Sequence, residues 1–166
     1  MIYSFMLKLH VITGSLGFAL GIGALLLPKF GLKAVWHRVV GRVYGMVMLI
    51  MSILSIPLAV QSQSTVLLVL GIFTLALVSG GWAAIWGWRG APNAYQKRRT
   101  LRRHIILMSA SYIGAWTAFL VNVQPLGGGS PLFWFYALGP TLVGIVLIAR
   151  RVRQLSPVPK PFPAVP

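Results

Sequence analysis

The stretch WHRVVGRVYG at residues 36–45 marks the point where a basic segment turns into a long apolar one, and it carries one of the three histidines of the chain. Unbroken apolar runs of near-spanning length lie on both sides of it. Such runs are typical of helices that cross a bilayer. The hydrophobic fraction of 57% and the mean hydropathy of +0.83 also exceed those of water-soluble domains. The sequence therefore predicts an integral membrane protein.

We expect an all-α fold, a bundle of five transmembrane helices within residues 1–153. The expected spans are apolar segments bounded by proline, basic residues or uncharged links, at about residues 3–27, 39–60, 66–88, 104–123 and 132–149. Residues 154–166 are rich in proline and are expected to form an extended tail. The first apolar run lacks the basic start and the cleavage site of a signal peptide, so we expect it to be retained.

Basic residues fill the first and third loops and the flank after the fifth span, whereas the second and fourth links carry no charge. The positive-inside rule therefore places the N-terminus outside and the C-terminus in the cytoplasm, and we expect the bacterial cytoplasmic (inner) membrane. The arginines expected to meet anionic lipids or an acidic partner are Arg38, Arg42, Arg98, Arg99, Arg102, Arg103, Arg150 and Arg151. Nucleic acid is disfavoured as a partner, because topology alone explains the charge.

Whole classes of chemistry are excluded by composition. The chain has fifteen Lys and Arg residues, no Asp or Glu, and no Cys. It therefore has no carboxylate acid–base pair, no Ser-His-Asp triad, no carboxylate proton relay and no Cys-ligated metal or cluster. Most hydrolase, pump and transporter mechanisms require one of these groups. No catalytic residue is predicted.

His37 and His104 each precede an apolar span on the same side of the membrane, so they are expected at one depth. Gly41 and Gly45 follow His37 at helical spacing and predict a smooth groove on that face. Imidazole is the usual ligand of haem b, and a flat porphyrin needs small neighbours. The pair is thus a candidate for the axial ligands of one haem b.

The same histidines have plainer interpretations. An interfacial histidine beside arginine often caps a helix or meets a phosphate, and in that case no cofactor is bound. Zinc fits less well, because it normally takes three or four protein ligands. His10 lies in the outer part of the first span, about 17 residues of helix from the inner end, so it cannot join the other two. At most one bis-histidine haem is expected within a single chain.

The two predicted hairpins are weakly repetitive: each has a basic turn, a histidine and then a tyrosine, as in His37 with Tyr44 and His104 with Tyr112. These residues belong to a wider resemblance. The motifs that carry it are LHxxxG at 9–14, HRxxGRxY at 37–44 with Met48, HIxxMxxSYI at 104–113, TAFL at 117–120 and GPTLxG at 139–144.

In these motifs the chain resembles an uncharacterised family of bacterial predicted membrane proteins, the domain of unknown function 2306. The resemblance implies an architecture similar to membrane two-haem b-type cytochromes, with His10, His37 and His104 as the corresponding histidines. Members of the family usually carry acidic residues in their loops. This chain has none, which puts any carboxylate-dependent activity in doubt.

Three functions are compatible with the sequence. The favoured one is a small, non-catalytic accessory subunit that packs against a larger membrane complex or forms a homo-oligomer. The alternative is a haem b electron-transfer module with His37 and His104 as ligands. The third is a carrier or channel for an anion or lipid, which is disfavoured because no charged residue is expected at mid-span.

Overall fold

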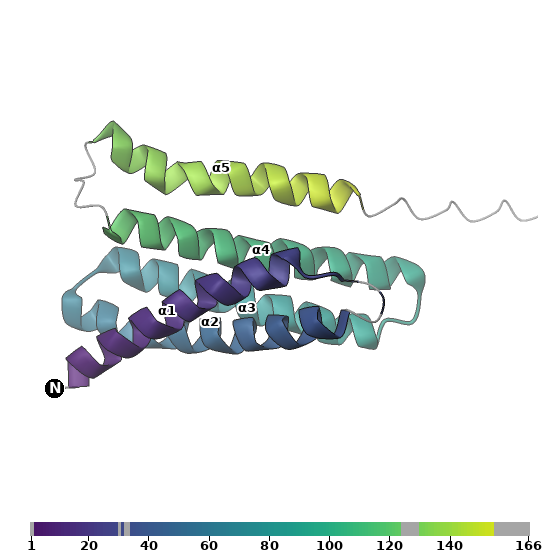
Figure 1. The fold of residues 1–166 in the computed structure, drawn as a ribbon, viewed down its shortest axis with the longest axis horizontal. Coiled ribbons are helices and arrows are strands. Elements are labelled where there is room, and N and C mark those ends of the chain that lie inside the picture. The colour runs from purple at the N-terminus through teal and green to yellow at the C-terminus, as the bar shows by residue number, and fades with distance from the viewer. Residues whose placement is uncertain (1, 30, 32–33, 124–129, 155–166) are drawn as a thin grey trace, which may run out of the picture.

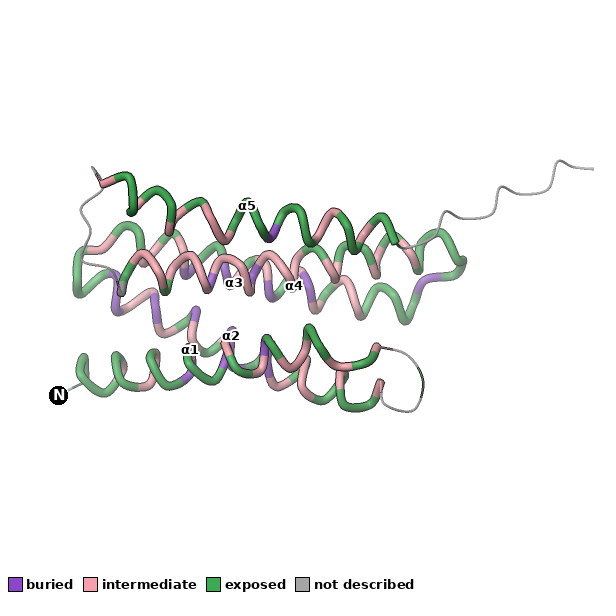
Figure 2. Tube along the Cα trace, turned by 45° about the horizontal axis from the view of Figure 1, so that its top comes forward, coloured by how far each residue is buried: buried purple, intermediate pink, exposed green. Residues whose placement is uncertain are grey.

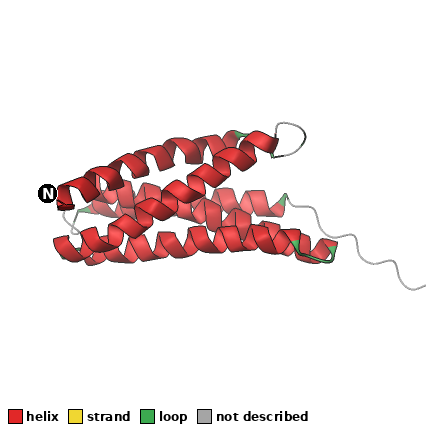
Figure 3. Ribbon diagram, turned by 90° about the horizontal axis from the view of Figure 1, so that it is seen from below, coloured by secondary structure: helices red, strands yellow, loops and turns green. Residues whose placement is uncertain are grey.

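The computed structural model describes residues 2–29, 31, 34–123 and 130–154. All regular structure within these ranges is α-helical (Figure 3). The helices are α1 Ile2–Leu26, α2 Ala34–Ser62, α3 Thr65–Arg89, α4 Ala94–Val123 and α5 Pro131–Arg153. Each is long and apolar enough to cross a membrane. The predicted all-helical class, with five helices that could cross a membrane, is confirmed for this part of the chain. Most of the predicted tail, residues 155–166, lies outside it.

The first four helices form a bundle in which consecutive helices pack side by side and α1 also contacts α4. The last helix is different, because among the described helices α5 packs only against α4 (Figure 1). Gly144 is the one residue of α5 that is buried (Figure 2). The fold is therefore a four-helix bundle with a fifth helix attached to one side.

The fourth helix begins ten residues earlier than the span predicted at 104–123. Asn93 starts it, because the Asn93 Oδ1 atom accepts the backbone N–H of Gln96 at 2.8 Å. The predicted basic loop at 89–103 is therefore mostly helical, since Lys and Arg are good helix formers once the start is capped. His104 lies nearly three turns inside α4, rather than at its beginning.

The connection between α2 and α3 is two residues long, shorter than the predicted link at 61–65. Gln63 has a φ of 52° and so adopts the left-handed conformation. The N–H of Ser64 donates to the Ala59 carbonyl at 2.9 Å, and the N–H of Gln63 donates to the Val60 carbonyl at 3.3 Å. This is the Schellman pattern that ends many helices. Ser64 then caps α3, because its Oγ accepts the N–H of Leu67.

The core lies where α2, α3 and α4 meet and is formed by Tyr44, Met48, Val78 and Ala115. Helices approach closely where a glycine of one helix is covered by a large side chain of another. The ring of Tyr112 on α4 covers Gly21 of α1. Small residues are the usual means of packing helices tightly in lipid, where burial of apolar surface does not drive association.

The indole of Trp82 covers Gly45 in the same way and joins α3 to α2. The sequence predicts Trp82, Trp86 and Trp88 together as an interfacial belt. The structure separates them, since Trp86 and Trp88 are exposed whereas Trp82 packs into the bundle. Trp82 therefore differs from the other two tryptophans in packing against a glycine of another helix.

Candidate functional site

Two histidines at one end of the bundle bond to neighbouring helices in the same manner. The Nδ1 atom of His37 on α2 lies 2.9 Å from the Ala24 carbonyl oxygen of α1. The Nδ1 atom of His104 on α4 lies 2.8 Å from the Gly81 carbonyl oxygen of α3. Each imidazole is therefore held against the first helix of its own hairpin.

These partners determine which ring nitrogen carries the proton. A backbone carbonyl can only accept a hydrogen bond, so each Nδ1 is the donor. In the neutral imidazole the lone pair then lies on Nε2. A hydrogen bond from the other nitrogen to a carbonyl is the usual way in which proteins orient a metal-ligating histidine. Both rings thus have the tautomer that a metal ligand needs.

The two histidines lie at the same level of the bundle. The hydroxyls of Tyr44 on α2 and Ser111 on α4 are 3.0 Å apart, and each stands seven residues after its histidine. Both helices run in the same direction, so seven residues back along each returns to one depth, about 10 Å away.

The third histidine is elsewhere. The Nδ1 atom of His10 on α1 lies 3.1 Å from the carbonyl oxygen of Met51 on α2. Met51 is fourteen residues beyond His37, which corresponds to about 21 Å of helix. Among the residues that the structure describes, no three potential ligands come together. The bond to a carbonyl is therefore common to all three histidines, and a second imidazole at the same level of the bundle is what distinguishes His37 and His104 from His10.

The glycines predicted beside His37 have different surroundings. A Cβ atom added at Gly41, one turn after His37, would have nothing within 4 Å. A Cβ added at Gly45 would meet the indole of Trp82. The smooth surface predicted on this face is therefore open at Gly41 and filled at Gly45.

Positive charge gathers at the same end as His37 and His104. The arginines predicted to meet lipid or a partner are exposed, except for the half-buried Arg98: Arg38, Arg42, Arg99, Arg102, Arg103, Arg150 and Arg151. They flank the loops between α1 and α2 and between α3 and α4, and the end of α5 (Figure 1). The basic residues of the two loops and of the end of α5 therefore lie at one end of the bundle, and the predicted orientation stays a prediction.

Lys29 shows how close these charges come to one another. Its Nζ donates to the carbonyls of Leu25 at 2.7 Å and Leu27 at 3.3 Å, where it caps the end of α1. Burial lowers the pKa of Lys29, and the nearby charge of Arg151 lowers it further.

Sequence reasoning missed the backbone acceptors of Ala24 and Gly81, because a carbonyl leaves no signal in the residue type. It also missed the hydroxyl pair of Tyr44 and Ser111, although their common spacing from a histidine could have indicated it. Comparison of the chain with protein-family models, curated proteins and solved structures gives no match. The resemblance to an uncharacterised membrane family therefore stays a prediction.

Proposed function

We propose that this protein is a membrane-embedded electron-transfer module that holds one haem b through His37 and His104. The observation that supports it is the pair of imidazoles at one level, each with Nδ1 bonded to a carbonyl and Nε2 left with its lone pair. A bound haem would supply a one-electron redox centre. We further propose that the basic end of the bundle faces the cytoplasm.

The chain's own residues would perform three tasks at this site. The Ala24 and Gly81 carbonyls fix the rotation of the two imidazoles. The side chains are therefore already oriented, and haem binding would cost little of their conformational entropy. Gly41 leaves space beside His37 for a flat ring. Arg38 and Arg42 lie on the same first turns of α2 and would offer positive charge to anionic propionates.

The test is a visible spectrum of the purified full-length protein from haem-replete cells, first oxidised and then reduced with dithionite. We expect sharp α and Soret bands in the reduced-minus-oxidised difference, at about one haem per chain. A colourless protein that also fails to take up added haemin would overturn the proposal.

The space at Gly41 allows a sharper version of this experiment. Gly41→Leu should reduce haem content strongly while the apoprotein keeps its stability, because the new side chain enters open space. Gly114→Leu is the matched control, since Gly114 also has nothing within 4 Å of an added Cβ but lies ten residues beyond His104. Equal haem content in both variants would argue against binding beside Gly41.

A second candidate is the non-catalytic accessory subunit. It is favoured by α5, which among the described helices contacts only α4 and leaves most of its apolar surface exposed. A larger membrane complex, or a second copy of the chain, would cover that surface. Co-purification of a stoichiometric partner in mild detergent would support this candidate. The visible spectrum distinguishes the two candidates, because an accessory subunit without haem would be colourless.

A further inference from the structure

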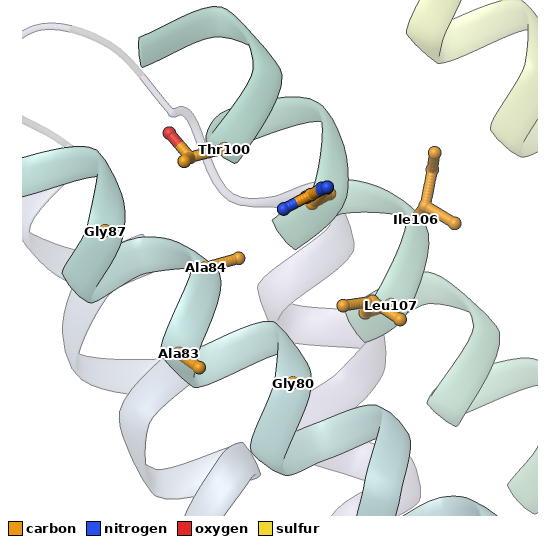
Figure 4. A pocket seen from close by; sticks show the side chains of 8 residues that line it. Gly80, Ala83, Ala84, Gly87, Thr100, Ile106 and Leu107 are labelled. Atoms are coloured by element: carbon orange, nitrogen blue, oxygen red, sulfur yellow. The ribbon is translucent and has the colours of Figure 1, made fainter. Parts of the chain in front are cut away.

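A groove runs between α3 and α4 on the outer surface of the bundle, with a volume of about 530 Å³. One wall is the stripe of small residues Gly80, Ala83, Ala84 and Gly87. The other wall includes Thr100, Arg103 and Leu107 (Figure 4). The volume is in the range of small-molecule sites. We propose that this groove binds an anionic phospholipid, with an acyl chain along the stripe and the phosphate at Arg103.

The walls are suited to a hydrocarbon chain. A Cβ added at Gly80 would meet the Cδ1 atom of Leu107 at 3.2 Å, and one added at Gly87 would meet the methyl of Thr100 at 3.6 Å, so the two walls are already in contact at these positions, through carbon atoms. The Thr100 hydroxyl donates into its own helix, to the Gln96 and Lys97 carbonyls, both at 3.0 Å. The groove between the helices therefore presents carbon rather than hydrogen-bonding groups.

Arg103 gives the groove its charge preference. It is exposed, and the chain contains no carboxylate side chain that could pair with it. The lack of carboxylate side chains also argues against a second copy of the chain in the groove, because that copy would bring only more positive charge to Arg103. A basic pocket between membrane helices at the expected cytoplasmic side is a typical site for an anionic headgroup.

The groove is separate from the histidine site. Gly81 accepts the bond from His104 and is covered by Met108, so this edge of α3 faces the bundle interior. The groove residues Gly80 and Ala84 are on the neighbouring face of α3. The two proposed sites therefore use different residues, and either proposal can fail alone.

The experiment measures lipid affinity of the full-length protein in phosphatidylcholine nanodiscs that contain increasing fractions of phosphatidylglycerol. The readout is the midpoint of thermal unfolding, with bound lipid counted by native mass spectrometry. We expect Arg103→Gln to weaken the preference for phosphatidylglycerol about fivefold, the loss typical of one basic residue at a membrane surface. Arg102→Gln, the adjacent exposed arginine outside the groove, should change it less than twofold. Equal losses in both variants would overturn the proposal in favour of diffuse charge.

A second variant tests the hydrocarbon part of the groove. Ala84→Leu should fill the groove and remove the bound lipid, whereas Ala76→Leu, on an exposed position two turns earlier in α3, should not. Unchanged lipid counts in Ala84→Leu would overturn the assignment to this groove. Excess inorganic phosphate should not stabilise the wild-type protein as phosphatidylglycerol does. If it does so equally, the site binds phosphate alone and the lipid is refuted.

Discussion

The hydroxyl groups of Tyr44 and Ser111 meet at 3.0 Å in the interior of the bundle, where they join α2 to α4. Ser111 Oγ already donates to the Met108 carbonyl at 2.8 Å, so the proton between the two hydroxyls comes from Tyr44. Both residues are almost completely shielded from solvent. The pair fixes the register of the two helices that carry His37 and His104.

Tyr44→Phe removes this donor and leaves the ring in place. We expect a loss of about 1 kcal/mol in the free energy of unfolding, as for other buried hydrogen bonds between membrane helices. Reversible unfolding in mixed detergent micelles measures it. Tyr95→Phe is the control, because Tyr95 is exposed before the apolar part of α4. Identical stabilities for the two variants would show that the hydroxyl contact is unimportant.

Glycines covered by rings should tolerate no side chain. Gly21→Ala and Gly45→Ala place a methyl against the rings of Tyr112 and Trp82 and should each cost about 1–3 kcal/mol. Gly114→Ala has open space and should be neutral or more stable by up to about 1 kcal/mol, since alanine favours helix. The same unfolding assay compares the three. A destabilised Gly114→Ala would contradict the packing described here.

Gln63 is the one non-glycine residue with a positive φ in the described part of the chain. Gln63→Gly should stabilise the protein by about 1 kcal/mol, because glycine adopts this conformation without strain. Gln61→Gly, two residues earlier and still helical, should instead destabilise by a similar amount. The midpoints of thermal unfolding of the two variants, compared with that of the wild-type protein, measure both changes. A loss of stability on Gln63→Gly would mean that its side chain contributes more than the strain costs.

Orientation can be mapped cleanly because the chain has no cysteine. Thr65→Cys should react with a membrane-impermeant maleimide in intact cells, and Ala94→Cys only after permeabilisation. Replacing Arg98 and Arg99 with Gln should leave this pattern intact, since many other basic residues remain at that end. Inverted labelling in the double Gln variant would refute the orientation argument.

Single histidine variants test the proposed ligands. His37→Ala and His104→Ala should each abolish the pigment, whereas His10→Ala should retain it, because His10 lies about 20 Å along the bundle. Haem content per chain, from the pyridine haemochrome spectrum, is the measurement. Equal loss from all three variants would exclude the pairing, and circular dichroism shows whether each variant is still helical.

Hydropathy was sufficient to predict the five helices, because in lipid a helix satisfies its own backbone groups and the signal is local. The start of α4 was misjudged, since a helix need not end where its apolar part ends and Asn93 caps it outside that part. Gly45 was expected to border a groove, yet Trp82 fills the position. A side chain arriving from another helix leaves no trace in the local sequence.

For the candidate site too, the sequence predicts positions along the chain but not the contacts between helices. The shared depth of His37 and His104 follows from their places in the chain, and it agrees with the level of the Tyr44–Ser111 contact seven residues further along both helices. The repeat suggested Tyr44 and Tyr112 as equivalents, but the hydroxyl partner of Tyr44 is Ser111. The angular position of a residue on a helix decides such contacts, and one residue changes it by about 100°.

The ring of contacts among α1 to α4 also has a consequence for biosynthesis. Tyr112 and Ser111 lie on α4, so Gly21 and Tyr44 gain these partners only once α4 has entered the membrane. Until then the hairpin of α1 and α2 lacks the contacts that Tyr112 and Ser111 make with it. Among the described helices α5 contacts only α4, so the contacts among α1 to α4 do not require it.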